Sequence, residues 1–295
     1  MHYKESYGRK AFMVCNTVFC SLVGIVCILP VIHILAVSLS SKNSVFSGLV
    51  TFWPVEFTWD AYHMVIRDFQ FFISYRNSII RVILGWLISM PLTVLAAYPL
   101  SLRKRQFPAR QIFVWYFMIT ILFNGGMIPT YLVVSELGLI DTIWSLLLVN
   151  SVPVFNVILV MNFMKALPES ISEAAYIDGA GHFVNLFQII LPLSKPSLAT
   201  VSLFVILDHW NAWFDGMIYI KNQNLKPLQT YLRSIVIVDS RVADSSSMIE
   251  DIVANVAADA ANGAKIFLAM VPILCLYPFF QKYFAKGIVR GSTKE

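Results

Sequence analysis

Six long apolar runs dominate this sequence and limit what it can fold into. An α-helix crosses a bilayer core with about 20 mostly apolar residues, and each run reaches that length. A β-barrel would instead need alternating segments of about ten residues. With 58% hydrophobic and 13% charged residues, the chain is predicted to be an all-α integral membrane protein with six transmembrane helices. The predicted spans are residues 11–39, 78–102, 111–134, 142–164, 198–220 and 264–284.

The first run has a competing interpretation as a secretory signal. It follows Lys4, Arg9 and Lys10, and Ala36-Val37-Ser38 could serve as a weak cleavage site. Its apolar core is longer than the usual signal core of about 7 to 15 residues. We therefore interpret it as a retained first membrane helix.

Basic residues cluster in alternate loops, and short basic loops stay in the cytoplasm. They precede the first span, fill residues 103–110 and follow the sixth span, whereas residues 135–141 contain no Lys or Arg. Both termini are therefore predicted to be cytoplasmic. The net charge of +5 requires no nucleic-acid partner, because these clusters would face an anionic inner leaflet.

The sequence gives no indication of a catalytic or metal site. The four cysteines lie in predicted spans without CxxC or Cys/His spacing. The histidines have neither ligand spacing nor a nucleophile partner. No GxxxxGK[ST] loop or Gly-rich dinucleotide fingerprint occurs. We expect no cofactor in this chain, so an ATP-driven process would need an ATPase on another chain.

The inner loop at residues 165–197 contains a short acidic segment rich in small residues. Ser170 and Glu173 have capping-box spacing, in which the Ser170 side chain bonds a backbone N–H of the first helical turn and the Glu173 side chain reaches back to the Ser170 N–H. A helix is therefore predicted to begin there. It is predicted to end at Gly179 or Gly181, where φ can turn positive.

The following segment, residues 182–191, is amphipathic, because Asn185 and Gln188 stand among Phe, Val, Leu and Ile. Such a segment can lie along the membrane surface. Pro192 and Pro196 are predicted to end it. The loop is thus predicted to be a helix, a turn and a second helix on the cytoplasmic side.

The fixed residues of this loop have a recognisable spacing. They read Glu173-Ala174-Ala175, three residues, Gly179, nine residues, Ile189, one residue and Leu191-Pro192. This pattern resembles the EAA loop of ABC importer permeases. An ordinary amphipathic hairpin would explain the helices but not the spacing. The resemblance implies a coupling helix that docks in a groove of an ATPase subunit through Glu173, Ala174, Ala175, Asp178, Gly179, Ala180 and Gly181.

The resemblance extends over essentially the whole chain to the MalG-type sugar permeases, in the branch associated with complex polysaccharides and sometimes labelled lipoprotein-type. It implies a type I ABC importer permease fold, with residues 1–295 as a single transmembrane domain. It also implies a multi-pass location in a bacterial inner (cytoplasmic) membrane. The motifs that carry it are Asn124 to Tyr131, Gly138 to Thr142, His209 to Asp215 and Tyr277 to Phe284.

The family further implies partners and a mechanism. These partners are a second related permease that forms a heterodimer, two ATPase subunits that hold ATP and Mg, and an extracytoplasmic solute-binding protein. The mechanism would be alternating access. The branch favours oligosaccharides, and an acidic uronate oligomer such as an alginate fragment is a candidate. The alternatives are an ABC permease for a non-sugar solute and an ATP-independent secondary carrier or channel. A membrane enzyme or scaffold has less support.

The fifth predicted span contains charged residues, which normally face a cavity or a partner inside a membrane. On a continuous helix, His209, Trp213 and residue 216 would share one face, and Asp208, Asn211 and Asp215 another. Carboxylates, amides and aromatic rings together suit sugar recognition. Internal pairing of the carboxylates, with the tryptophans at the membrane interface, is the alternative.

Amides and turn residues interrupt the third and fourth spans. Asn124, with the glycines after it, and Asn156 are candidates for the cavity wall or gate, since irregular backbone is tolerated where it lines a cavity. Helix packing through small residues and amides would also explain them. In the long outer loop, residues 227–232 and 248–261 are predicted to form short helices above the membrane.

Overall fold

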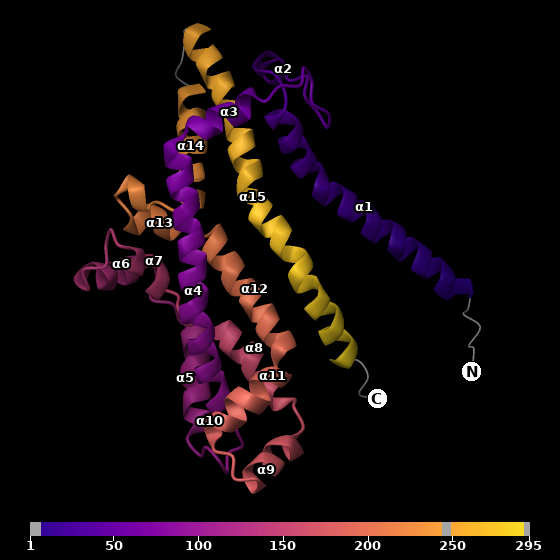
Figure 1. The fold of residues 1–295 in the computed structure, drawn as a ribbon, viewed down its shortest axis with the longest axis vertical. Helices are drawn as coiled ribbons and strands as arrows, with labels where there is room; N and C mark the ends of the chain where they lie inside the picture. Colours follow the sequence, from indigo (N-terminus) through magenta and orange to yellow (C-terminus); the bar gives the residue numbers. More distant parts are fainter. Residues whose placement is uncertain (1–6, 244–248, 292–295) are drawn as a thin grey trace. The chain divides into compact units, whose positions relative to one another are not determined.

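The computed structural model describes residues 7–243 and 249–291, with side chains described for residues 7–235 and 260–281. Every described element is a helix (Figure 1), which confirms the all-helical prediction. The chain divides into two compact units. One contains the residues up to Phe71 together with Leu232–Val271, and the other contains Phe72–Tyr231 and the residues from Pro272. The assignment to one permease domain stays a prediction.

Three helices are by themselves long and apolar enough to cross a membrane. They are α1 (Tyr7–Ser38), α4 (Phe69–Ser101) and the segment Ala260–Gln281 of α15 (Ile249–Gly291). They correspond to the predicted first, second and sixth spans. The count of spans reaches six when each of three bent helix pairs is taken as one span. These pairs are Arg110–Leu122 with Met127–Glu136, Val154–Lys165 with Glu169–Ile177, and His182–Leu193 with Lys195–Asn211.

The third span is broken where the sequence indicated an interruption. Helices α5 (Arg110–Leu122) and α6 (Met127–Glu136) are bent by 112°. The side chain of Asn124 accepts the Gly126 N–H at 2.9 Å inside the break. With 13 residues, α5 is roughly 20 Å long, so it is too short to cross a bilayer core of about 30 Å alone.

The fourth and fifth predicted spans are also broken. The sequence indicated an interruption in the fourth, whereas the prediction of the fifth as one continuous helix was wrong. The fourth consists of α7 (Ile143–Leu148) and α8 (Val154–Lys165). The fifth consists of α12 (Lys195–Asn211) and α13 (Phe214–Tyr219). The break before α13 contains neither Gly nor Pro, and its two carbonyls accept hydrogen bonds from side chains elsewhere in the same unit. Arg81 donates to the Ala212 carbonyl at 3.2 Å, and Thr230 donates to the Trp213 carbonyl at 2.8 Å.

The core of the second unit forms where α4, α8, α12 and η1 meet. The π-helical turn η1 (Asn185–Ile190) joins α10 (His182–Val184) to α11 (Leu191–Leu193). Fully buried valines from α8 and α12 pack at the centre of this core. In a membrane such packing, rather than a hydrophobic driving force between helices, holds them together. The central residues are Ala97, Val157, Val160, Val201 and Val205.

The cytoplasmic loop contains α9 (Glu169–Ile177), but the predicted capping box does not form. The helix begins two residues earlier than expected, after Pro168, and has no side-chain cap. Ser170 therefore lies inside the helix and cannot act as an N-cap residue. Gly179 has φ +83°, which confirms it as the stop, whereas Gly181 has φ −79°.

The second helix of this loop continues further than predicted. Helical backbone runs from His182 through Pro192 to Leu193 and then bends by 81° into α12. Pro192 lies directly after the π-helical turn η1, inside this helical run rather than at its end. The segment is thus continuous as a helix past the predicted end.

The outer segments of the first unit contain α2 (Lys42–Phe46) and α3 (Asp60–Arg67). Ser38 and Tyr62 join the end of α1 to α3 through their hydroxyls at 2.9 Å. Lys265 of α15 pairs with Asp68 at 2.6 Å, which neutralises a cation on an apolar helix.

The outer loop before the sixth span is more helical than predicted. The first predicted short helix is the start of α14 (Leu228–Ala243). Of the second, residue 248 lies outside the described residues, and the rest is the N-terminal part of α15. Within residues 249–261, the second predicted helix is therefore not separate from the sixth span but continuous with it in α15.

Candidate functional site

A cavity of about 520 Å³ lies beside the break between α12 and α13. Residues from α4, α6, α12 and α13 and from the irregular segments between them contribute to its wall. Irregular backbone at membrane depth is expected only where protein covers it or a cavity adjoins it, and this break meets that condition. Polar members of the wall are Arg81, Ser89, Asn124, Asn150, Thr130, Asp208, His209, Asp215 and Tyr219.

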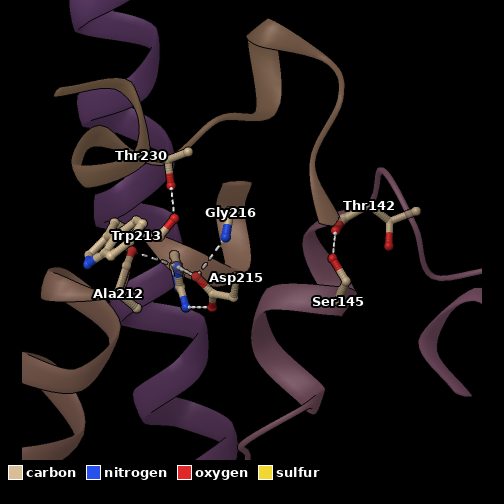
Figure 2. Close-up of polar contacts among 8 residues, drawn as sticks. Thr142, Ser145, Ala212, Trp213, Asp215, Gly216 and Thr230 are labelled. Atoms are coloured by element: carbon tan, nitrogen blue, oxygen red, sulfur yellow. Dashed lines mark hydrogen bonds and ion pairs between the residues drawn. The ribbon is translucent and has the colours of Figure 1, made fainter. Parts of the chain in front are cut away.

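Arg81 and Asp215 form an ion pair in the wall of this cavity. The Arg81 side chain is 3% exposed and the Asp215 side chain 26% exposed, so the cation is the more deeply buried partner. Asp215 also accepts the Gly216 N–H at 2.7 Å. Figure 2 shows Asp215 beside Ala212 and Gly216, and Thr230 bonded to the backbone of Trp213. Arg81 of α4 thus pairs with Asp215 of α13 and donates to the Ala212 carbonyl in the break.

His209 reaches the cavity from α12 through a close approach to α4. A Cβ atom at Gly85 would collide with the His209 imidazole ring. Only glycine therefore leaves room for this ring against α4. His209 is 7% exposed, and its position is determined by the shape of α4.

The structure brings together only some of the predicted substrate-pathway residues. Asn124, Asp208, His209 and Asp215 line the cavity. Asn156, Asn211 and Trp213 are not among the lining residues. Asn156 is 2% exposed inside α8, where it belongs to the helix packing.

The predicted grouping of these residues on two helical faces was wrong. It assumed one continuous helix, but α12 ends at Asn211, so positions beyond the break do not follow its periodicity. Arg81 was missed because the second span was interpreted only as an apolar run. Its signal was a single cation inside that run, which is costly unless paired.

The cytoplasmic helix α9 presents most of the predicted coupling residues at the surface. Glu173, Ala174, Asp178, Gly179 and Gly181 are exposed, and Ala180 is half-buried. Ala175 is 7% exposed, so it faces the protein's own core and cannot contact a docked partner. Ile177 was not singled out from the sequence, yet it is 86% exposed.

Charged residues flank α9 on the side of the basic loop. Arg103 pairs with Glu169 and lies 3.7 Å from Glu173. All three side chains are more than half exposed, so these pairs add little stability. These ion pairs place Arg103 beside the first turns of α9 without adding much to its stability.

The described residues contain no group of three or more His, Cys, Asp or Glu that could hold a metal ion. The four cysteines are free and exposed.

Broken membrane-spanning helices around a polar cavity, together with an exposed cytoplasmic helix, define a permease of the ABC importer type. No protein-family model matches the chain. It is 38% identical over 277 residues to the polygalacturonan/rhamnogalacturonan transport system permease protein YtcP of Bacillus subtilis, covering 94% of this chain and 96% of that protein. It is also 38% identical over 288 residues to protein LplC of Bacillus subtilis, covering 97% and 95% of the two chains.

A solved structure supports the same assignment. It is that of a bacterial ABC transporter involved in the import of the acidic polysaccharide alginate, with a TM-score of 0.83 and 31% identity over 96% of this chain and 99% of that one. The chain therefore belongs to the MalG-type family of carbohydrate ABC importer permeases.

Family membership decides between the alternatives left open by the sequence. The chain is a multi-pass protein of the cytoplasmic membrane and a permease of a binding-protein-dependent sugar importer, not a secondary carrier or channel. Permease subunits have no ATPase activity of their own, and ATP binds to the partner ATPase. The assembly implies a partner permease, ATPase subunits and a binding protein. The individual site residues remain predictions.

Proposed function

We propose that this chain forms one wall of the import pathway for oligosaccharides that contain uronate sugars. The observation that carries the proposal is the polar cavity with Arg81 in its wall. Arginine binds carboxylates through two parallel hydrogen bonds, and Asp215 provides that carboxylate in the structure. A uronate carboxylate offers the same pair of oxygens and can compete with Asp215 for Arg81.

The relatives support this substrate class. One is named as a permease for polygalacturonan and rhamnogalacturonan, and the transporter of known structure is involved in the import of the acidic polysaccharide alginate. Acidic sugar polymers are thus common to both relatives. The second related permease, which completes the heterodimer, would supply the facing wall.

The remaining wall groups suit sugar hydroxyls. Asp208 is exposed at the cavity and accepts hydrogen bonds, while Asn124 can both donate and accept. Tyr219 and Phe214 add aromatic surface to the wall. This combination binds a hydroxyl-rich chain without requiring one fixed pose.

Movement would come from the cytoplasmic side. Closing of the two ATPase subunits would pull α9, and the cavity would open outward toward the loaded binding protein by alternating access. The exposed surface of Glu173, Ala174, Ile177, Asp178 and Gly179 is the proposed docking surface. Ala180 and Gly181 form the turn behind it.

The substrate class is tested with the complete complex reconstituted in proteoliposomes. ATP hydrolysis is measured with trigalacturonate, its methyl ester, trimannuronate, maltotriose and a tripeptide. We expect the two uronate trimers to stimulate hydrolysis and the methyl ester to do so weakly, because the ester keeps the backbone and loses the charge. Stimulation by maltotriose and not by the uronates would replace the acidic class with neutral sugars.

The docking surface is tested with Glu173→Lys and Gly179→Pro. Proline cannot adopt φ +83°, so the second variant displaces the turn after α9. We expect both variants to insert normally and to lose transport. The matched control is Glu136→Lys, a charge reversal at an exposed site of α6. Normal transport by both α9 variants would remove the central support for docking.

A further inference from the structure

A polar cluster lies in the second unit where α9 meets α4. Five side chains from four elements meet there, and we call them the cytoplasmic hub. They are Tyr98 of α4, Ser172 and Tyr176 of α9, His182 of α10 and Asn185 of η1.

The hub is built around two hydroxyls and one imidazole nitrogen. The Tyr98 hydroxyl lies 3.2 Å from His182 Nδ1 and 3.4 Å from the Tyr176 hydroxyl. The Tyr176 hydroxyl lies 3.1 Å from the same Nδ1. Asn185 Nδ2 lies 3.3 Å from the Tyr98 hydroxyl and 3.2 Å from the Tyr176 hydroxyl. It also lies 3.4 Å from Ser172 Oγ.

Two central members of the hub are buried, so leaving their polar groups without hydrogen bonds would cost free energy. Tyr98 is 8% exposed and Asn185 is 1% exposed. A buried polar group without a hydrogen bond is costly. Asn185 Oδ1 has no partner among the described residues, and its π-helical turn is a type often found at functional sites.

The hub has more close contacts than protons to fill them. When Nδ1 is the acceptor, each phenol supplies one proton and the amide supplies two. The phenol protons then have two mutually exclusive patterns. In one, Tyr98 donates to His182 and Tyr176 donates to Tyr98. In the other, Tyr176 donates to His182 and Tyr98 donates to Tyr176.

Both patterns keep every phenol bonded, but they connect different elements. In the first pattern, Tyr98 bonds α4 directly to α10. In the second, Tyr176 bonds α9 to α10, and Tyr98 of α4 donates to α9 instead. A small shift of α9 against α4 can therefore exchange one pattern for the other without leaving a buried hydroxyl unpaired. Such an exchange gives the contact two discrete arrangements, which a coupling element requires.

We propose that the hub transmits movement of α9 to α4 by exchanging these two patterns, with Tyr98 and Tyr176 as positioning residues for transport. The inference rests on the proposed docking of α9 on the ATPase. It adds the route by which that docking reaches the helix that carries Arg81.

The test measures cavity opening without any sugar. In the complete complex, Cys15, Cys20, Cys27 and Cys275 are replaced by alanine, and Thr130→Cys introduces one thiol at the cavity wall. Its rate of maleimide labelling is compared with and without ATP and vanadate. Tyr98→Phe and Tyr176→Phe each remove one hydroxyl, so that only the remaining phenol can donate to His182 and the two patterns can no longer be exchanged.

We expect each Phe variant to reduce the ATP-dependent change in labelling roughly fivefold, the effect of losing one net hydrogen bond. The double variant should be no worse than either single variant, because both act on the same bonds. Tyr116→Phe on α5, where the ring is 64% exposed, should behave as the parent. The loss of one net hydrogen bond should lower the melting temperature by only roughly 2 to 4 °C. A merely structural role would give that shift and leave the ATP-dependent change in labelling as in the parent.

A wild-type response to ATP in both single variants would overturn the proposal that the hub transmits movement. Additive effects of the two variants would also overturn it, because they would indicate independent contacts. Failure of docking is recognised separately, since Glu173→Lys would then leave the parent's ATP response intact. An absent response in the parent itself would overturn both proposals.

Discussion

The ion pair between Arg81 and Asp215 allows a prediction with a direction and a size. Removing one partner of a buried pair costs about 3 to 5 kcal/mol, mostly because the other charge is left uncompensated. The Arg81 side chain is 3% exposed and that of Asp215 26% exposed, so the two single variants should not cost the same. Arg81→Gln leaves a carboxylate that water reaches, and we expect about 2 kcal/mol. Asp215→Asn leaves a buried guanidinium, and we expect about 4 kcal/mol.

The double variant Arg81→Met with Asp215→Leu is the control. It removes both charges and leaves neither uncompensated, so it should lie within about 1 kcal/mol of the parent. Part of the remaining cost is the Ala212 carbonyl, which loses its bond to Arg81 at 3.2 Å. With the matching single variants Arg81→Met and Asp215→Leu, a double-mutant cycle isolates the interaction between the two side chains.

The assay is thermal unfolding of the purified complex in detergent. A loss of 1 kcal/mol lowers the melting temperature of a domain of this size by roughly 2 to 4 °C. We therefore expect a shift of roughly 4 to 8 °C for Arg81→Gln, a larger shift for Asp215→Asn and little change for the double variant. Equal shifts for the two single variants, or a double variant worse than both, would refute the reasoning from burial.

Two further predictions concern packing and pH. Gly85→Ala should destabilise the protein by about 1 to 3 kcal/mol, because the new methyl group collides with the His209 ring. Adding His209→Ala should recover most of that loss in the same melting assay, and no recovery would show that the collision is not the cause. Glu56 accepts hydrogen bonds from Ser41 and Ser44, which lower its pKa below the usual 4.5. The stabilisation that these two hydrogen bonds give to the folded loop is therefore fully present above the usual pKa. It is lost as pH falls through the lower pKa that Glu56 has in the folded state. Limited proteolysis of residues 40–59 should increase on acidification, and Glu56→Gln should abolish the pH dependence.

The sequence predicted the parts of the site whose signals are local. Asp208, His209 and Asp215 stood out as polar residues in an apolar run, and all three line the cavity. The residues around Ser170 and Glu173 predicted a short cytoplasmic helix, and of its two predicted stops, Gly179 and Gly181, the first was correct. Each of these inferences needed only neighbouring residues and a general rule.

The parts that failed depend on groups distant in sequence. The break after Asn211 contains no turn residue, and it is stabilised by Arg81, which lies 131 positions away from its partner Ala212. The capping box failed because the N-cap residue of the helix is Pro168 instead of Ser170, a shift within the usual uncertainty of helix ends. Local patterns cannot give either result.

Helix α4 links the two ends of the proposed mechanism. Arg81 lies at the cavity and Tyr98 at the hub, 17 positions apart on the same helix, which corresponds to roughly 25 Å. A rigid helix would carry any displacement of Tyr98 directly to Arg81. Pro91 lies between them, and proline removes one backbone bond from a helix and permits a bend.

The surroundings of Pro91 indicate where such a bend would be accommodated. Ser89 Oγ and Thr93 Oγ1 are buried on either side of it, without a partner among the described residues. Hydroxyls near a proline can bond the backbone groups that it frees, so a change of bend would exchange bonds there as well. Movement at the hub would then reach Arg81 as a rotation of the outer half of α4. That rotation would alter the competition between Asp215 and a uronate for the same guanidinium.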